Sequence, residues 1–184
     1  MLGKEKYTLS NLIDKNLYRM SNIWRYSGRT ILRPENIAEH SFYVTYKVHE
    51  IGHKYHLDES RINKAARIAL CHDIAETETG DFPHSLKVYS EDIKNMSEEL
   101  ELKVIKDSFN LFYEDFKDFI EETDPVVCSL VRLADITDVI MFIDREETLG
   151  NRDPEILEIK TESYERYFNE IKLFEEALKN EETK

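Results

Sequence analysis

Apolar residues recur at helical spacing along almost the whole chain, and this periodicity most narrows the folds open to it. No run of alternating apolar and polar residues indicates a strand. Only 5 Gly and 4 Pro interrupt 184 residues, which leaves room for long helices. A chain of this length can bury a substantial core. The sequence therefore predicts an all-α protein in which residues 1–184 form a single compact helical bundle.

Helix start signals divide the chain at four points. Asn36, with Glu39 three residues later, predicts a capping box. Asp58 is a further N-cap candidate, and two Asp-Pro pairs match an N-cap followed by proline in the first turn. The expected helical segments are 5–22, 37–56, 59–76, 90–119, 125–148 and 154–180, separated mainly by loops at 23–35 and 77–87.

Residues of metal-ligating type occur at three places on these segments: His40, the doublet His72-Asp73, and Asp135. Imidazole nitrogen and carboxylate oxygen together suit Zn, Mn, Fe, Co or Ni better than Ca. Such a set can leave coordination positions open for water, as hydrolysis requires. Since a helix advances about 100° per residue, Glu76 would share one helical turn with His72 and Asp73.

Asp135 falls on the same helical stripe as Val131, Val139 and Phe142. Burying an unpaired carboxylate costs on the order of several kcal/mol, so this side chain requires a partner. The partner can be a metal ion or N–H donors. The alternative is an ion pair with Arg132 or with an arginine far away in the sequence.

His40 shares the side of its helix with Val44, so an ordinary core histidine is the alternative to a metal ligand. His49, His53 and His56 have a spacing that resembles a ligand set. They lie about 160–220° around the helix from His40 and cannot join its site. We expect them on a solvated face.

The chain carries 25 basic and 38 acidic side chains, a net charge of -13, yet no acid occurs from Lys15 to Arg33. Arginine offers a planar fork that matches phosphate oxygens, so this basic segment predicts a phosphate clamp. Pairing with acidic surface elsewhere is the alternative. Trp24 and Tyr26 flank Arg25 and can contact a base or sugar or belong to the core; Trp24 is expected in the core. The cations are Lys15, Arg19, Arg25, Arg29 and Arg33.

A tight turn at residues 79–83 follows Glu76 directly. It would place Asp81 at the rim of the same site, where its carboxylate can accept a hydrogen bond from a substrate hydroxyl. The alternative is a local cap at the end of the helix.

Together these residues resemble the HD-domain metal-dependent phosphohydrolases, and most closely the bacterial 5'-deoxynucleotidase group. The matching segments are Arg25-Tyr26, residues 35–41, 72–76 and 79–83, and Lys87. The similarity covers roughly residues 9–145. The resemblance implies one HD-domain helical bundle, with a metal and substrate core over about 9–145 and a C-terminal helix at about 154–180.

The resemblance also implies a role for each site residue. Glu76 is the catalytic acid or base, Arg25 binds phosphate, and Asp81 contacts the sugar 3'-hydroxyl. Tyr26 stands where the family has Trp beside the sugar, and Lys87 completes the substrate-binding set. One divalent ion (Co, Mn, Zn, Fe or Ni, with Mg possible) would be held by His40, His72, Asp73 and Asp135.

The predicted function is removal of the 5'-phosphate from deoxyribonucleoside monophosphates. A deoxynucleoside triphosphate hydrolase of dATP type is the alternative that keeps the same site, and its longer phosphate chain would suit the extra cations, Lys87 among them. A non-catalytic nucleotide-binding HD protein is the third possibility. The substrate is a small-molecule deoxynucleotide in each of the two enzyme hypotheses.

Bulk properties restrict partners and location. The acidic excess disfavours nucleic acid binding. No apolar run approaches the roughly 20 residues of a membrane span, and the N-terminus lacks the core of a secretory signal. Cys71 and Cys128 are expected to be buried thiols of a cytoplasmic protein. An apolar stripe on the helix at 154–180 predicts core packing, or else the interface of a homodimer or higher homo-oligomer.

Overall fold

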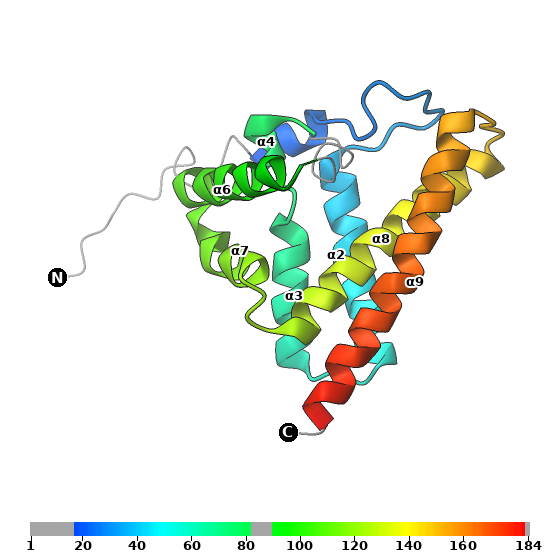
Figure 1. Ribbon diagram of the computed structural model, residues 1–184. Helices are drawn as coiled ribbons and strands as arrows, with labels where there is room; N and C mark the ends of the chain where they lie inside the picture. Colours follow the sequence, from blue (N-terminus) through cyan, green and yellow to red (C-terminus); the bar gives the residue numbers. More distant parts are fainter. Residues whose placement is uncertain (1–16, 82–89, 183–184) are drawn as a thin grey trace.

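The computed structural model describes residues 17–81 and 90–182, and over these ranges the protein is built from helices (Figure 1). The only extended pairing within them is an isolated bridge between Trp24 and Asn36. The all-α prediction is confirmed. In chain order the helices are η1 (Leu17–Asn22), α2 (Ile37–Lys54), α3 (Glu59–Cys71), α4 (Glu76–Thr79), α6 (Glu91–Ser108), η2 (Asn110–Phe112), α7 (Tyr113–Ile120), α8 (Pro125–Thr148) and α9 (Pro154–Glu182).

Three of the predicted N-caps form as the local sequence indicated. Asn36 Oδ1 accepts a hydrogen bond from the Glu39 amide at 3.0 Å, and this bond starts α2. The carboxylates of Asp58 and Asp124 accept from the backbone amides three residues later, at 3.1 and 3.2 Å. Each cap satisfies an amide that has no partner inside its helix, which stabilises the helix start by about 1 kcal/mol.

The main core lies where α2, α3 and α8 meet, with α9 packed along α8 (Figure 1). Val44, Ile68 and Leu130 are among its fully buried members, and Phe174 joins from α9. Gly52 is fully enclosed in α2 because α3 approaches closely there: a Cβ atom at this position would lie 2.7 Å from Ile62 Cγ1. The α2 residues of this core, Val44 and Val48 with Ile51 packed against them, lie in the middle and C-terminal half of the helix and hold it against α3 and α8.

The helix expected over 59–76 ends earlier, at Cys71, and this part of the prediction was wrong. The His72 Nδ1 atom lies 2.7 Å from the Ala69 carbonyl oxygen, which in a continuing helix would accept from the Asp73 amide. The chain then forms a turn in which the Ile74 amide donates to Cys71 and the Glu76 amide to Asp73, both at 3.0 Å. His72 and Asp73 therefore lie in a turn between α3 and α4.

The long helical region expected over 90–119 is also interrupted. The helix α6 ends at Ser108, and Phe109 takes an extended φ of -134° while its side chain is buried with only 5 % exposed. Burying Phe109 against the core requires the chain to leave the helical path there, and it resumes through η2 into α7.

The apolar stripe on α9 is only partly buried, so core packing accounts for part of it. Phe174 is fully buried in the main core, whereas Phe168 is 65 % exposed and Leu157 is 40 % exposed. Cys71 and Cys128 are buried free thiols, as expected. No helix within residues 17–81 and 90–182 has the length and apolar character needed to cross a bilayer.

Candidate metal centre and active site

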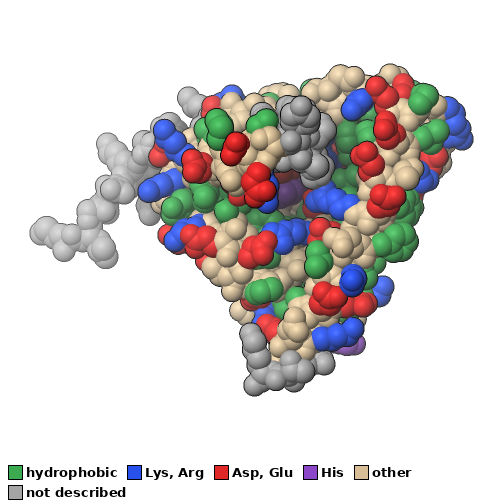
Figure 2. All heavy atoms as spheres, in the orientation of Figure 1, with side chains coloured by type: hydrophobic (Ala, Val, Ile, Leu, Met, Phe, Trp, Pro, Cys, Tyr) green, Lys and Arg blue, Asp and Glu red, His purple; other side chains and the backbone are tan. Residues whose placement is uncertain are grey.

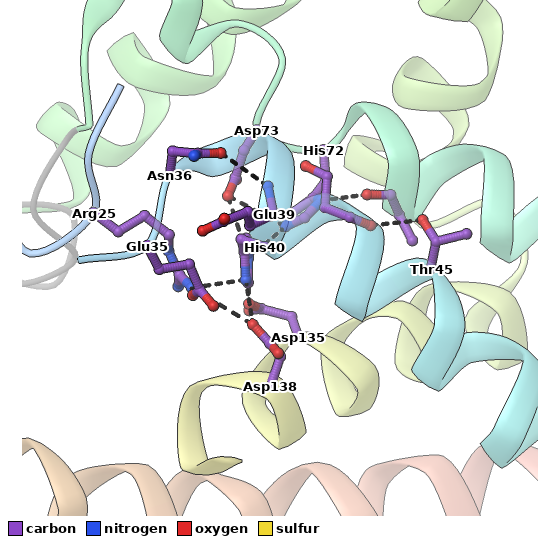
Figure 3. Close-up of polar contacts among 12 residues, drawn as sticks. Arg25, Glu35, Asn36, Glu39, His40, Thr45, His72, Asp73, Asp135 and Asp138 are labelled. Atoms are coloured by element: carbon purple, nitrogen blue, oxygen red, sulfur yellow. Dashed lines mark hydrogen bonds and ion pairs between the residues drawn. The ribbon is translucent and has the colours of Figure 1, made fainter. Parts of the chain in front are cut away.

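His40 is the central residue of the candidate site. It lies in the first turn of α2, where the Asn36 cap sets the start of the helix, and its side chain is completely buried. Figure 3 shows His40 between Asp73, from the turn after α3, and two carboxylates of α8, Asp135 and Asp138. Its Nδ1 atom lies 2.7 Å from Asp138 Oδ2, so its Nε2 atom faces the other ligand candidates.

The predicted metal ligands converge on this Nε2 atom. His72 Nε2 lies 3.2 Å from it. Asp73 Oδ2 lies 3.4 Å from the same atom and 3.3 Å from His72 Nε2, and Asp135 Oδ1 lies 3.3 Å from His40 Nε2. The structure thus brings together four residues that are spread over almost one hundred positions of the sequence.

The chemistry of these atoms fits a divalent cation. A carbonyl oxygen only accepts hydrogen bonds, so His72 Nδ1 donates to Ala69 and its Nε2 lone pair points towards His40. Two imidazole nitrogens and two carboxylates that face one another repel unless a cation lies between them. The nitrogen and oxygen donors suit a transition metal such as Zn²⁺ or Co²⁺, and His40, His72 and Asp73 place ligand atoms within 4.8 Å of one another.

The close approach of these side chains shifts the pKa values of His40 and Asp135. Burial and the nearby Arg25 lower the pKa of His40, but its hydrogen bonds with Asp135 and Asp138 outweigh them and raise it to about 9. Burial raises the pKa of Asp135, yet His40 and Arg166 hold it well below its usual range. The site therefore attracts positive charge strongly at neutral pH.

Asp135 has an ion-pair partner in addition to its place at the metal site. Its Oδ2 atom lies 3.1 Å from Arg166 Nη2 on α9, while Oδ1 faces His40. Arg132, the nearby candidate from the sequence, pairs with Glu122 instead. The two partners that the sequence treated as alternatives, a metal site and a distant arginine, thus approach different oxygens of one carboxylate.

Arg25 reaches the other face of His40. Its Nη1 atom lies 3.0 Å from Glu35 Oε2 and 3.7 Å from Asp138 Oδ2, and only 13 % of the side chain is exposed. The next residue, Tyr26, adopts a left-handed φ of 58°, and its ring stacks on Phe142 at 4.9 Å. Such strained backbone is frequent at functional sites.

Asp81 meets the same segment, since its Oδ2 atom accepts a hydrogen bond from the Tyr26 amide at 3.1 Å. Burial raises its pKa, although Arg25 acts in the opposite direction. Glu76 begins α4, four residues after His72, and is partly buried. Lys87 lies outside the described residues, so its predicted role stays a prediction.

Two of the five cations in the basic segment pair with acidic residues instead of forming the expected clamp. Arg19 pairs with Glu78 at 2.5 Å and Arg29 with Glu155 at 2.6 Å, which is the alternative of pairing with acidic residues elsewhere. Among these two and Arg25, only Arg25 lies beside the metal ligands. Trp24 is 50 % exposed, so its expected place in the core was wrong. Lys15 lies outside the described residues.

The surface agrees with this distribution. Figure 2 shows acidic and basic side chains interspersed over the visible face, with histidine exposed in a hollow near its centre beside cationic side chains. Of the three histidines expected on a solvated face, His53 and His56 are exposed and His49 is partly exposed; none groups with the candidate ligands around His40.

Glu35 and Asp138 were missed by the sequence reasoning, although both are buried next to His40. A signal for Asp138 was present, because it follows Asp135 by three residues and so shares its helix face. Both residues also line a cavity of about 510 Å³ between α2 and α8, which includes Phe42 and Arg145. The predicted metal ligands do not line that cavity.

Comparisons with known proteins identify the family of the chain. The family model described as "5'-deoxynucleotidase YfbR-like" matches residues 14–179. A 5'-deoxynucleotidase of Vibrio vulnificus, VV1113, is 28% identical over 150 residues, which are 75% of this chain and 76% of that protein.

Solved structures have the same fold. The PH0347 protein from Pyrococcus horikoshii is 26% identical with a TM-score of 0.69, and the match covers 90% of this chain and 94% of that one. The cyanophage S-2L HD phosphohydrolase DatZ, solved with dA and one catalytic Zn²⁺ ion, has the same TM-score of 0.69 at 19% identity, over 92% of this chain and 96% of that one.

Proposed function

The chain belongs to the YfbR-like 5'-deoxynucleotidase family, and on this premise we propose that it removes the 5'-phosphate of deoxyribonucleoside monophosphates in a metal-dependent reaction. The observation that supports the proposal most directly is the convergence of His72, Asp73 and Asp135 on the Nε2 atom of His40, at 3.2 to 3.4 Å. A phosphate-binding arginine, Arg25, is held on the opposite side of the same imidazole.

A divalent ion held by these four residues would supply Lewis-acid polarisation of the phosphate and activation of water. Arg25 would donate from its guanidinium to the phosphoryl oxygens as negative charge develops on them. Because Arg25 is largely shielded from solvent, its charge is weakly screened and acts strongly on the reacting group. Glu76 would transfer the proton between water and the leaving oxygen.

The sugar would lie beside Tyr26 and Asp81, whose backbone and side chain are joined by a hydrogen bond. This bond fixes Asp81 relative to Arg25. The residue that would bind the phosphate and the residue that would bind the sugar hydroxyl are therefore held at a fixed separation. The Tyr26 ring, which is stacked on Phe142, would restrict the space around the sugar. We propose that this restriction favours deoxyribose over ribose.

The ion pairs of Arg19 and Arg29 support a monophosphate as substrate. Both guanidiniums are engaged by carboxylates away from the metal ligands, which removes two of the cations that a triphosphate chain would need. To bind a triphosphate in the same site, Arg19 and Arg29 would have to leave their carboxylate partners. A deoxynucleoside triphosphate hydrolase is therefore the weaker proposal.

We further propose that residues 1–184 form one domain in a cytoplasmic homo-oligomer, at least a dimer. The buried free thiols of Cys71 and Cys128 suit a reducing compartment. The exposed Phe168 and Leu157 on α9 suit an interface between copies. Sedimentation of the purified protein tests the oligomeric state.

The function is tested with a panel of dNMPs, NMPs and dNTPs incubated with Co²⁺, Mn²⁺ or Mg²⁺. We expect inorganic phosphate from dNMPs, less from NMPs, and neither pyrophosphate nor triphosphate from dNTPs. Absence of hydrolysis of every substrate with every metal would refute the enzyme assignment. The Glu76→Ala variant should bind metal as the native protein does and lose turnover; preserved turnover would remove Glu76 from the mechanism.

A further inference from the structure

Asp138 is a buried carboxylate that the roles assigned above leave unused. It lies on α8 one turn after Asp135 and is only 4 % exposed. Its Oδ2 atom is 2.7 Å from His40 Nδ1, on the side of the ring opposite the nitrogen that faces His72 and Asp73. Asp138 therefore stands apart from His72 and Asp73, and instead groups with Glu35 around the opposite nitrogen of His40.

The contact determines which nitrogen of His40 carries the proton. A carboxylate accepts hydrogen bonds and a guanidinium only donates them. Asp138 and Arg25 both lie 2.7 Å from Nδ1, and that atom can satisfy only one of them. If Nδ1 donates to Asp138, the Nε2 lone pair is free to bind a metal; if it accepts from Arg25, a neutral ring carries its proton on Nε2 and cannot bind.

Asp138 also acts on Arg25. The Arg25 guanidinium lies 3.7 Å from the Asp138 carboxylate and 3.0 Å from Glu35. Glu35 is 2 % exposed, and a second guanidinium, from Arg145, approaches its other oxygen at 3.7 Å. With Glu35 and Asp138 beside it, Arg25 has a carboxylate for its charge without taking the lone pair of His40.

We propose that Asp138 is a positioning residue that couples the metal site to the phosphate site. It holds His40 in the Nδ1-protonated form and keeps Arg25 beside the same imidazole. Glu35, in contrast, holds Arg25 but does not orient the His40 ring. Carboxylates that orient a ligating histidine in this way commonly contribute about 10- to 100-fold to metal affinity or activity. This inference rests on the proposed function for the role of Arg25, but not for the state of His40.

The test compares three isosteric variants. Asp138→Asn can place an amide N–H against Nδ1 and favour the proton on Nε2. We expect its Kd for Co²⁺, measured by calorimetry without substrate, to weaken about 10- to 100-fold, together with a higher KM for dNMP. Glu35→Gln should raise KM while its Kd for Co²⁺ stays within about twofold. Asp144→Asn, on the same helix but paired with Lys160, should change neither.

A measurement on the native chain does not depend on how the variants fold. Long-range ¹H–¹⁵N spectra of histidine-labelled, Zn²⁺-loaded protein should show His40 with its proton on Nδ1. A proton on Nε2, or a Kd for Co²⁺ in Asp138→Asn within twofold of native, would overturn the inference. If the native protein hydrolyses no dNMP, the proposed function fails, while the Co²⁺ and tautomer results still decide the role of Asp138.

Discussion

The carboxylate of Glu146 gives the sharpest stability prediction, because it anchors the loop that carries Arg25. It is fully buried on α8 and accepts three hydrogen bonds of 2.8 Å, from the Leu32 and Arg33 amides and from Asn151 Nδ2. These two amides lie only two and three residues before Glu35, which holds Arg25. Glu146 thus joins the last third of the chain to the substrate-binding segment.

The perturbation is Glu146→Gln. Glutamine can accept with one oxygen, but its amide group must then point N–H bonds at a donor that the carboxylate had satisfied. Losing one hydrogen bond to a charged group and leaving a buried donor without a partner costs about 2–3 kcal/mol. For a chain of this size each kcal/mol corresponds to about 2–4 °C in Tm. We expect the free energy of unfolding to fall by about 2–3 kcal/mol in the variant.

The assay is urea denaturation followed by circular dichroism, at pH 7 and at lower pH. Burial raises the pKa of Glu146, but its hydrogen bonds from Asn151, Leu32 and Arg33 outweigh burial and hold it below 4.5. A folded pKa below the unfolded value stabilises the protein above about pH 4.5 and loses that effect as pH falls through the folded pKa. The difference between native and variant should therefore shrink in acid.

A matched control is Glu147→Gln, one residue along, where a more exposed carboxylate pairs with Lys160. Removing such a surface pair should cost less than about 1 kcal/mol. The reasoning is refuted if Glu146→Gln unfolds within about 0.5 kcal/mol of the native protein at pH 7, a change typical of neutral surface substitutions. It is equally refuted if the difference between native and variant grows as the pH falls below 4.5.

Further predictions concern the metal, the core and the phosphate site. Chelation of a metal present at about 100 times its Kd should lower the free energy of unfolding by about 2.7 kcal/mol. The change is measured as a fall in Tm that added Co²⁺ reverses. An unchanged Tm would contradict a metal site that forms only in the folded chain. Gly52→Ala should destabilise by about 1–3 kcal/mol, because its Cβ would lie 2.7 Å from Ile62 Cγ1, and urea unfolding at native stability would contradict this. Arg25→Lys keeps the charge but loses the planar fork, so kcat/KM for dNMP should fall at least about tenfold, whereas Arg29→Lys should match the native enzyme. Equal kinetics of the two lysine variants would remove Arg25 from phosphate binding.

Helix starts were predictable because an N-cap is a contact between a side chain and a backbone amide three residues later. Asn36, Asp58 and Asp124 all form the caps that their sequence neighbours indicated. The early end of α3 was not predictable from periodicity. There the side chain of His72, instead of the Asp73 amide of a continuing helix, donates to the Ala69 carbonyl oxygen.

The candidate site was predictable in part: its candidate metal ligands were identified, but the buried carboxylates Glu35 and Asp138 were missed. The types of His40, His72, Asp73 and Asp135, with the motifs around them, pointed to a metal and a phosphate before any coordinates. The single-domain assignment, the roles of individual site residues and the oligomeric state stay predictions.

The sequence by itself determined the helical class, the starts of α2, α3 and α8, and which residues are candidates for metal ligands, because these depend on residue type and on contacts a few positions apart. Only the tertiary structure decided which charges meet. In the folded chain Arg19 pairs with Glu78, Arg29 pairs with Glu155, and Asp135 pairs with Arg166. The tertiary structure also placed Asp138 against His40, 98 residues away. Such pairs depend on how whole helices pack, because no local rule relates side chains that only the folded core brings within hydrogen-bond distance.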